Sequence, residues 1–160
     1  MRSVLSAYEA LLAAGEHAKA HTGDKERPVG AAIAVFDPAY QIVYGTNVYP
    51  EQAEVTEDKS NIRHAEEDVI LAARAAGLVL ERAIMYVTKA PCLDCAKLIV
   101  ETKVDVVIMA SPDPTSRWYD SQLEGVKYLR DNKIAVNRIT EVGDIIRDVE
   151  QFKSEQSSAR

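Results

Sequence analysis

A histidine, a glutamate and two cysteines in this chain of 160 residues have the types and spacing of a metal-centred reaction site. His64-Ala65-Glu66 is followed further along the chain by Pro91-Cys92-Leu93-Asp94-Cys95. One imidazole and two thiols suit Zn²⁺, which prefers nitrogen and sulfur ligands in tetrahedral geometry. A structural zinc site closes with four protein ligands, whereas a catalytic site leaves one position for water. Three ligands therefore indicate an open, reactive metal.

Glu66 lies two residues beyond the histidine, close enough to reach a metal-bound water without being a ligand. Zinc lowers the pKa of such a water to roughly 7, which provides hydroxide at neutral pH. A carboxylate within hydrogen-bond reach can take the proton of this water and pass it to a ring nitrogen and then to a departing amine. The pattern H-x-E followed by P-C-x-x-C is the signature of the zinc nucleobase deaminases. Hydrolytic loss of ammonia from an aminated base is the predicted reaction.

Hydrophobic periodicity and turn residues predict the elements that position these groups. Helices are expected at 3–20, 64–76, 92–102, 119–132 and 143–153, and strands at 29–36, 41–46, 83–88, 104–110 and 134–142. Both motifs open a helix, where unpaired N–H groups and the helix dipole favour thiolates and a bound hydroxide. The strand at 104–110 is almost wholly apolar, which predicts a central strand in a sheet covered on both faces.

This order of elements predicts an α/β fold, a three-layer α-β-α sandwich with a mixed five-stranded sheet flanked by helices. The sheet is mixed because its first two strands form a hairpin. The polar loop at 47–61 is long enough to be functional or mobile. We expect residues 1–160 to form a single zinc-dependent deaminase domain, with about 154–160 as a polar tail that frays.

The composition, 47% hydrophobic and 28% charged, is typical of a soluble globular protein. No apolar run approaches the ~20 residues of a membrane span, and the first residues lack a signal-peptide core. Both cysteines belong to the motif, which excludes a disulfide framework. We therefore expect a cytoplasmic protein without a membrane partner. The net charge of −6 and the lack of a Lys/Arg cluster disfavour nucleic acid as a partner.

Three other interpretations of the motifs are weaker. A lone C-x-x-C can be a thioredoxin-like redox pair, but such pairs follow the first strand, whereas this one follows the third. A four-ligand structural zinc needs another ligand, and the remaining histidines, His17 and His21, are predicted on a solvated face of the first helix. A non-catalytic, zinc-stabilised interaction module has no need of the carboxylate at Glu66.

The segment from Pro91 to Ile99 resembles the zinc segment of deoxycytidylate (dCMP) deaminases, within the cytidine deaminase superfamily. The likeness extends from Val29-Gly30-Ala31 through Gly45-Thr46-Asn47 and His64-Ala65-Glu66 to roughly Val136, which is most of the chain. The zinc motif is highly specific for the superfamily, and Cys95-Ala96-Lys97 points to the deoxycytidylate branch.

The resemblance implies a role for each matching residue. By this resemblance, His64, Cys92 and Cys95 bind zinc, and Glu66 transfers protons. Asn47 forms a hydrogen bond with the substrate, and the backbone N–H groups of Ala65 and Cys92 face the base. A simple turn asparagine remains the alternative for Asn47. Trp118 or Tyr119 is expected to pack on the pyrimidine, with helix-to-sheet packing as the alternative. The family commonly forms dimers or hexamers, which implies a homo-oligomer.

Two departures from the family pattern concern the substrate. The family's turn usually continues with a second glycine and an Arg-Gly pair, where this chain has Val48–Gln52. Its helix usually has Asn-Ala where this chain has Asp68 and Val69. Both changes remove polar or basic features near the nucleotide and leave the 5′-phosphate contact open. Possible phosphate partners, each also explained as a solvated surface residue, are Arg27, Arg63, Lys89 and Arg117.

The leading interpretation is hydrolysis of the 4-amino group of a cytosine nucleotide, dCMP to dUMP plus ammonia. Zinc-bound hydroxide attacks C4 in this interpretation, and Glu66 shuttles the protons. A free nucleoside, a free base or a modified cytosine nucleotide is the alternative substrate within the same chemistry. A polynucleotide editor is disfavoured by the acidic charge balance.

Overall fold

The computed structural model describes residues 3–139. The helix expected at 143–153 and the expected polar tail lie outside these residues. The helices are α1 (Ala7–His21), α2 (Ala65–Ala75), α3 (Leu93–Thr102) and α4 (Tyr119–Asp131). The strands are β1 (Gly30–Val35), β2 (Gln41–Thr46), β3 (Ile84–Val87), β4 (Val106–Ala110) and β5 (Ala135–Ile139). None of the helices in the described range is both long and apolar enough to cross a membrane.

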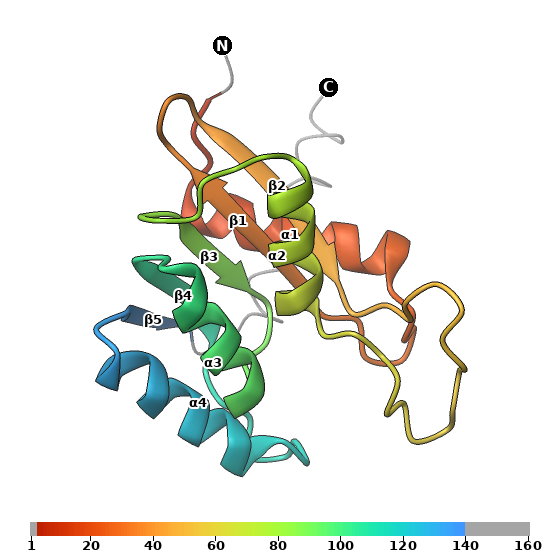
Figure 1. Cartoon of the computed structure of the whole chain (residues 1–160). Coiled ribbons are helices and arrows are strands. Elements are labelled where there is room, and N and C mark those ends of the chain that lie inside the picture. The colour runs from red at the N-terminus through yellow and green to blue at the C-terminus, as the bar shows by residue number, and fades with distance from the viewer. Residues whose placement is uncertain (1–2, 140–160) are drawn as a thin grey trace, which may run out of the picture.

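The five strands form one mixed sheet in the order β2-β1-β3-β4-β5 (Figure 1). Strand β1 is antiparallel to both β2 and β3, whereas β3, β4 and β5 are parallel. Parallel strands need a long crossover connection, and α3 and α4 provide it here. The predicted hairpin and the predicted mixed five-stranded sheet are confirmed.

Helices cover both faces of this sheet, which gives the three layers. Helix α1 lies against β1, β2 and β3 on one face, and α2 and α3 lie on the other, with α4 packed beside α3 (Figure 1). All six residues of β1 are buried. The side chains of β1 alternate between two apolar clusters on opposite faces of the sheet. Ala32 and Ala34 pack in the cluster that contains residues of α1. Ala31, Ile33 and Val35 pack in the larger cluster, which contains residues of α2 and α3.

Strand β4 lies between β3 and β5, which confirms the prediction of a central strand. Its alternate residues Val107 and Met109 are fully buried on one face, whereas Val106, Ile108 and Ala110 are half-buried on the other. Ile108 packs against the apolar cluster that contains α1, although α1 itself lies mainly on β1, β2 and β3.

Two glycines permit the close packing that positions the helices of the motifs. A Cβ on Gly45 of β2 would lie 2.4 Å from the backbone nitrogen of Val69, so only glycine allows α2 to rest on this strand. A Cβ on Gly125 of α4 would lie 2.7 Å from the carbonyl oxygen of Pro91. The close approach of α4 thereby supports the segment that leads into the two cysteines.

Candidate functional site

The two motifs meet because each begins a helix. His64 is the N-cap of α2 and Cys92 is the N-cap of α3, both with extended backbone. Neither side chain caps its own helix, which leaves both side chains to face each other across the helix starts. Nδ1 of His64 lies 3.7 Å from Sγ of Cys92 and 3.3 Å from Sγ of Cys95.

These three side chains form a candidate zinc-binding site. Their ligand atoms all lie within 4.8 Å of one another. Ligands of a tetrahedral zinc, at bond lengths of roughly 2.0–2.3 Å, stand about 3.5–3.8 Å apart, which is close to the separations seen here. Within the described part of the chain, His17 and His21 belong to no such group. His17 is half-buried and stacks on Tyr44, so the expectation of a solvated face is wrong for this residue.

The two thiols differ in acidity. A hydrogen bond from Cys95 lowers the pKa of Cys92 to about 4, although burial opposes the shift, and His64 lowers it further. The same hydrogen bond and burial raise the pKa of Cys95. A hydrogen bond with Cys92 raises the pKa of His64. The lowered pKa of Cys92 favours the thiolate, the form of cysteine that binds a metal.

Glu66 is the second residue of α2 and is only 5% exposed. Burial raises the pKa of its carboxyl group, while the neighbouring His64 opposes this shift. A raised pKa brings a carboxyl group closer to the operating pH, where proton transfer in both directions is most effective. Because Glu66 lines the same cavity as His64 and Cys92, its carboxyl group can act on a molecule bound beside the metal ligands.

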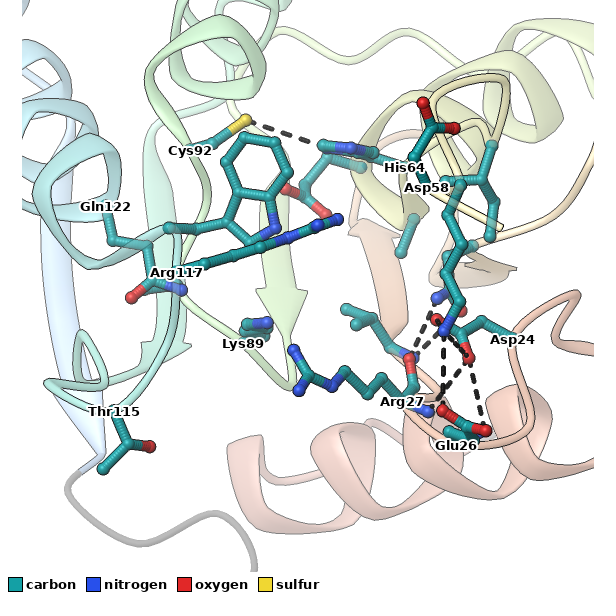
Figure 2. A pocket seen from close by; sticks show the side chains of 18 of the residues that line it. Asp24, Glu26, Arg27, Asp58, His64, Lys89, Cys92, Thr115, Arg117 and Gln122 are labelled. Carbon is teal, nitrogen blue, oxygen red and sulfur yellow. Dashed lines mark hydrogen bonds and ion pairs between the residues drawn. The ribbon is translucent and has the colours of Figure 1, made fainter. Parts of the chain in front are cut away.

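The site opens into a cavity of about 410 Å³. His64 and Cys92 lie at one side of this cavity, and the side chains of Lys89, Arg27 and Gln122 lie across it (Figure 2). This volume is in the range of small-molecule sites in proteins. The cavity is therefore large enough for a ligand that extends away from the zinc ligands.

The structure brings most of the predicted substrate contacts to this cavity. Asn47, Ala65 and Trp118 line it, whereas Tyr119, the first residue of α4, does not. The side chain of Trp118 is 39% exposed and lies edge-on to His64, with ring centroids 6.0 Å apart. The substrate roles of Asn47, Ala65, Trp118 and Tyr119 stay predictions.

The Asn47 side chain is held firmly by the protein. Its Oδ1 accepts hydrogen bonds from Oγ1 of Thr22 at 2.7 Å and from the backbone N–H of Val29 at 3.0 Å. Its Nδ2 donates to the carbonyl oxygen of Arg27 at 3.0 Å. These bonds join the end of β2 to the segment before β1, so Asn47 also shapes the cavity wall.

The four candidate phosphate partners separate into two groups. Arg27, Lys89 and Arg117 line the cavity. Arg63 does not; its guanidinium group pairs with Asp68 at 2.6 Å, and Asp68 also accepts a hydrogen bond from the backbone N–H of Thr46. The unusual Asp68 thus joins α2 to β2 and to the chain before it.

Sequence reasoning missed several residues of the cavity wall. Lys59 forms ion pairs with Asp24 at 3.0 Å and with Glu26 at 3.7 Å, which joins the loop before His64 to the segment before β1. Gln122 is 1% exposed and lines the cavity from α4. The long polar loop before His64 was the only signal for Lys59, and Gln122 had none.

A comparison with protein families shows to which family this chain belongs. Residues 6–111 match the model described as the cytidine and deoxycytidylate deaminase zinc-binding region. The chain belongs to this family. The resemblance that the motifs indicated is therefore confirmed, and so is a zinc-binding domain. The chain has no significant match among curated protein sequences.

Solved structures of other deaminases share the fold. The dCMP deaminase of cyanophage S-TIM5 has a TM-score of 0.64 and 20% identity, over 82% of this chain and 96% of that one. A Thermotoga maritima diaminohydroxyphosphoribosylaminopyrimidine deaminase/reductase has a TM-score of 0.65 and 26% identity, over 88% and 38%. Guanine deaminase from Nitrosomonas europaea has a TM-score of 0.58 and 15% identity, over 96% and 87%. The names of these neighbours give different substrates, so the likeness shows the shared fold and leaves the substrate of this chain to other arguments.

Proposed function

We propose that the protein is a zinc-dependent hydrolase that deaminates a cytosine nucleotide, converting dCMP and water to dUMP and ammonia. One observation carries this proposal. His64, Cys92 and Cys95 converge at two helix starts, and the buried Glu66 lines the same cavity as His64 and Cys92. A structural zinc site has no use for that carboxyl group.

The roles follow from the positions of the side chains. His64, Cys92 and Cys95 would hold the zinc, which supplies, when bound, a water that is acidic enough to react at neutral pH. Glu66 accepts a proton from the water and donates it to the ring nitrogen next to C4. It then takes the second proton, from the oxygen now bound to C4, and passes it to the amino group, so that a C=O bond replaces the C–N bond and ammonia departs.

The comparisons support a nucleotide as substrate. The cyanophage dCMP deaminase has been solved in complex with dCMP and dUMP. The Thermotoga protein, which is the more similar in sequence, is named for a phosphoribosylaminopyrimidine. A related aminated pyrimidine nucleotide is therefore the second candidate. Guanine, the substrate named for the Nitrosomonas protein, has no phosphate.

Deamination by the purified, zinc-loaded protein tests this function. dCMP, CMP, deoxycytidine, cytosine and guanine are compared, and ammonia release is measured for each. We expect turnover of dCMP, and a loss of roughly 10²–10⁴-fold in kcat for Glu66→Gln because the amide cannot carry the proton. Zinc content should stay the same in this variant. If wild-type protein with bound zinc released no ammonia from any of the five compounds, the proposed function would be wrong.

A further inference from the structure

Three cationic side chains line the cavity and belong to none of the ion pairs within residues 3–139. Arg27 precedes β1, Lys89 follows β3 and Arg117 follows β4, and all three line the cavity (Figure 2). Lys59, which lines the same cavity, is instead paired with Asp24. Asp113 and Glu66 act on Lys89 through longer-range charge interactions and form no ion pair with it, so its ammonium group can still pair with a bound anion.

Lys89 is the central residue of this group. Its side chain is half-buried. Burial lowers the pKa of its ammonium group, and the positive charge of Arg27 lowers it further. Both effects disfavour the cation, whereas an anion bound beside it would restore the charged form. Asp113 and Glu66 oppose this shift and raise the pKa, but burial and Arg27 outweigh them, which favours a negatively charged ligand beside Lys89.

Gln122 adds an oriented neutral donor. Its Oε1 accepts a hydrogen bond from the backbone N–H of Asp113 at 3.0 Å, which determines which end of the amide is the oxygen. The NH₂ end is then turned to the cavity, on the side of Lys89 (Figure 2). A buried amide with one end held by the backbone is a rigid donor for a ligand oxygen.

We propose that Lys89, Arg27 and Gln122, with Arg117 beside them, form a subsite for the 5′-phosphate of the substrate. This inference rests on the proposed function and deepens it, because it makes a nucleoside monophosphate the preferred substrate over a nucleoside or a base. Lys89 and Arg27 lie across the cavity from His64 and Cys92, whereas Arg117 reaches toward His64 (Figure 2). This arrangement suits a nucleotide whose base is bound at the metal and whose phosphate lies at the other end.

The test compares dCMP with deoxycytidine, which differ only in the phosphate. Steady-state kcat and KM are measured for the zinc-loaded wild type, Lys89→Met, Gln122→Glu and a control, Lys97→Met, which changes an exposed lysine of α3. Gln122→Glu keeps the acceptor for Asp113 but replaces the donor with a group that repels phosphate. Thermal unfolding and zinc content identify any variant that fails to fold.

We expect the wild type and Lys97→Met to prefer dCMP. In Lys89→Met and Gln122→Glu, the ratio of kcat/KM for dCMP to that for deoxycytidine should fall roughly ten- to a hundredfold, mainly through KM. Equal losses on both substrates would show a structural role for these residues and overturn the subsite. Equal use of dCMP and deoxycytidine by the wild type would overturn it as well.

A binding measurement separates failure of the subsite from failure of the proposed function. Calorimetry with zinc-loaded Glu66→Gln compares the affinities of dCMP and deoxycytidine without turnover. Tighter binding of dCMP that is lost on adding Lys89→Met supports the subsite, even if the wild type deaminated neither compound. If the two compounds bound equally well, the subsite would be wrong, whatever the activity of the wild type.

Discussion

The Glu66 carboxyl group is buried beside two thiols and an imidazole. Its burial lowers the stability of the folded protein unless a cation binds nearby. Burial of ionisable groups without compensation destabilises a folded protein, and the raised pKa values of Glu66 and Cys95 express this cost. A metal ion held by His64, Cys92 and Cys95 would remove it by keeping both sulfurs as thiolates. At the scale of single residues, activity and stability therefore depend on the same ligands.

Removal of zinc should lower the thermal midpoint of unfolding. A ligand present at 100–1,000 times its Kd stabilises the folded state by about 3–4 kcal/mol, which corresponds to roughly 6–16 °C for a chain of this size. Scanning calorimetry with zinc and with a chelator measures the difference. Cys95→Ser should show a much smaller difference than the wild type. Equal midpoints for the wild type in both conditions would contradict a metal site at these residues.

Asp24 gives a prediction about pH. Burial raises the pKa of its carboxyl group, but hydrogen bonds from Lys59 and from the backbone N–H of Arg27 outweigh this effect, so the pKa is lowered. A lowered pKa in the folded state means that the ionised group stabilises the fold above its ordinary pKa of 3.8. This contribution is lost as pH falls through the folded-state pKa.

We therefore expect Asp24→Asn to be less stable than the wild type by about 1 kcal/mol at pH 7. The difference should shrink as pH falls below about 4, because the wild-type carboxylate is then protonated. Urea unfolding between pH 7 and pH 3 measures it. Asp131→Asn, which removes an exposed ion pair with Lys127, is the control and should change stability by less. A difference that is independent of pH would mean that the Asp24 charge is unimportant.

At the scale of elements, the packing of α4 on α3 holds the zinc ligands in place. Ser121 of α4 accepts a hydrogen bond from the backbone N–H of Leu93 at 2.9 Å, directly after Cys92. The backbone of Pro91 and Cys92 lies against Gly125. The start of α3 is thus supported from outside the motif.

Gly125→Val should weaken both the fold and the metal site. The added side chain would overlap the Pro91 carbonyl oxygen and move α4 or the start of α3, at a cost of about 1–3 kcal/mol. Zinc affinity, measured by competition with a chelator, should fall because Cys92 moves. Gly77→Ala is the matched control. It has a positive φ of 74° but no atom within 4 Å of a Cβ, so it should lose about 1 kcal/mol and retain its zinc affinity. An unchanged zinc affinity in Gly125→Val would show that the packing of α4 does not support the metal site.

At the scale of the whole molecule, helices on the faces of the sheet expose apolar side chains. Leu71 of α2 is 43% exposed and Leu123 of α4 is 42% exposed. The likeness to the dCMP deaminase branch implies assembly through such sheet-flanking helices. Single exposed apolar residues are common in monomers, so these two support an interface only together with the family relationship.

We expect a homo-oligomer, a dimer or a hexamer. Light scattering coupled to size exclusion should give two or six times the monomer mass of 17.6 kDa. Leu71→Glu and Leu123→Glu place charges on the exposed helix faces and should shift the mass towards the monomer if these faces are in the interface. A wild-type mass of 17.6 kDa at micromolar concentration would contradict the prediction.

The amino-acid sequence by itself pointed to the candidate zinc ligands and to Glu66, and it determined the hairpin and the order of helices and strands along the chain. These depend on short spacings and on local periodicity, which a sequence displays directly. Helix starts at His64 and Cys92 follow from the same local signals, because a helix begins where its apolar repeat begins.

Only the tertiary structure decided which polar side chains share the cavity. It brings Lys89 and Gln122 to the wall, pairs Arg63 with Asp68 outside it, and leaves Tyr119 away from it. It also leaves one face of β4 half-buried. Each of these outcomes depends on how segments far apart in sequence pack together. A local pattern carries no information on that packing, because the direction of each side chain is set by the partner that its element meets.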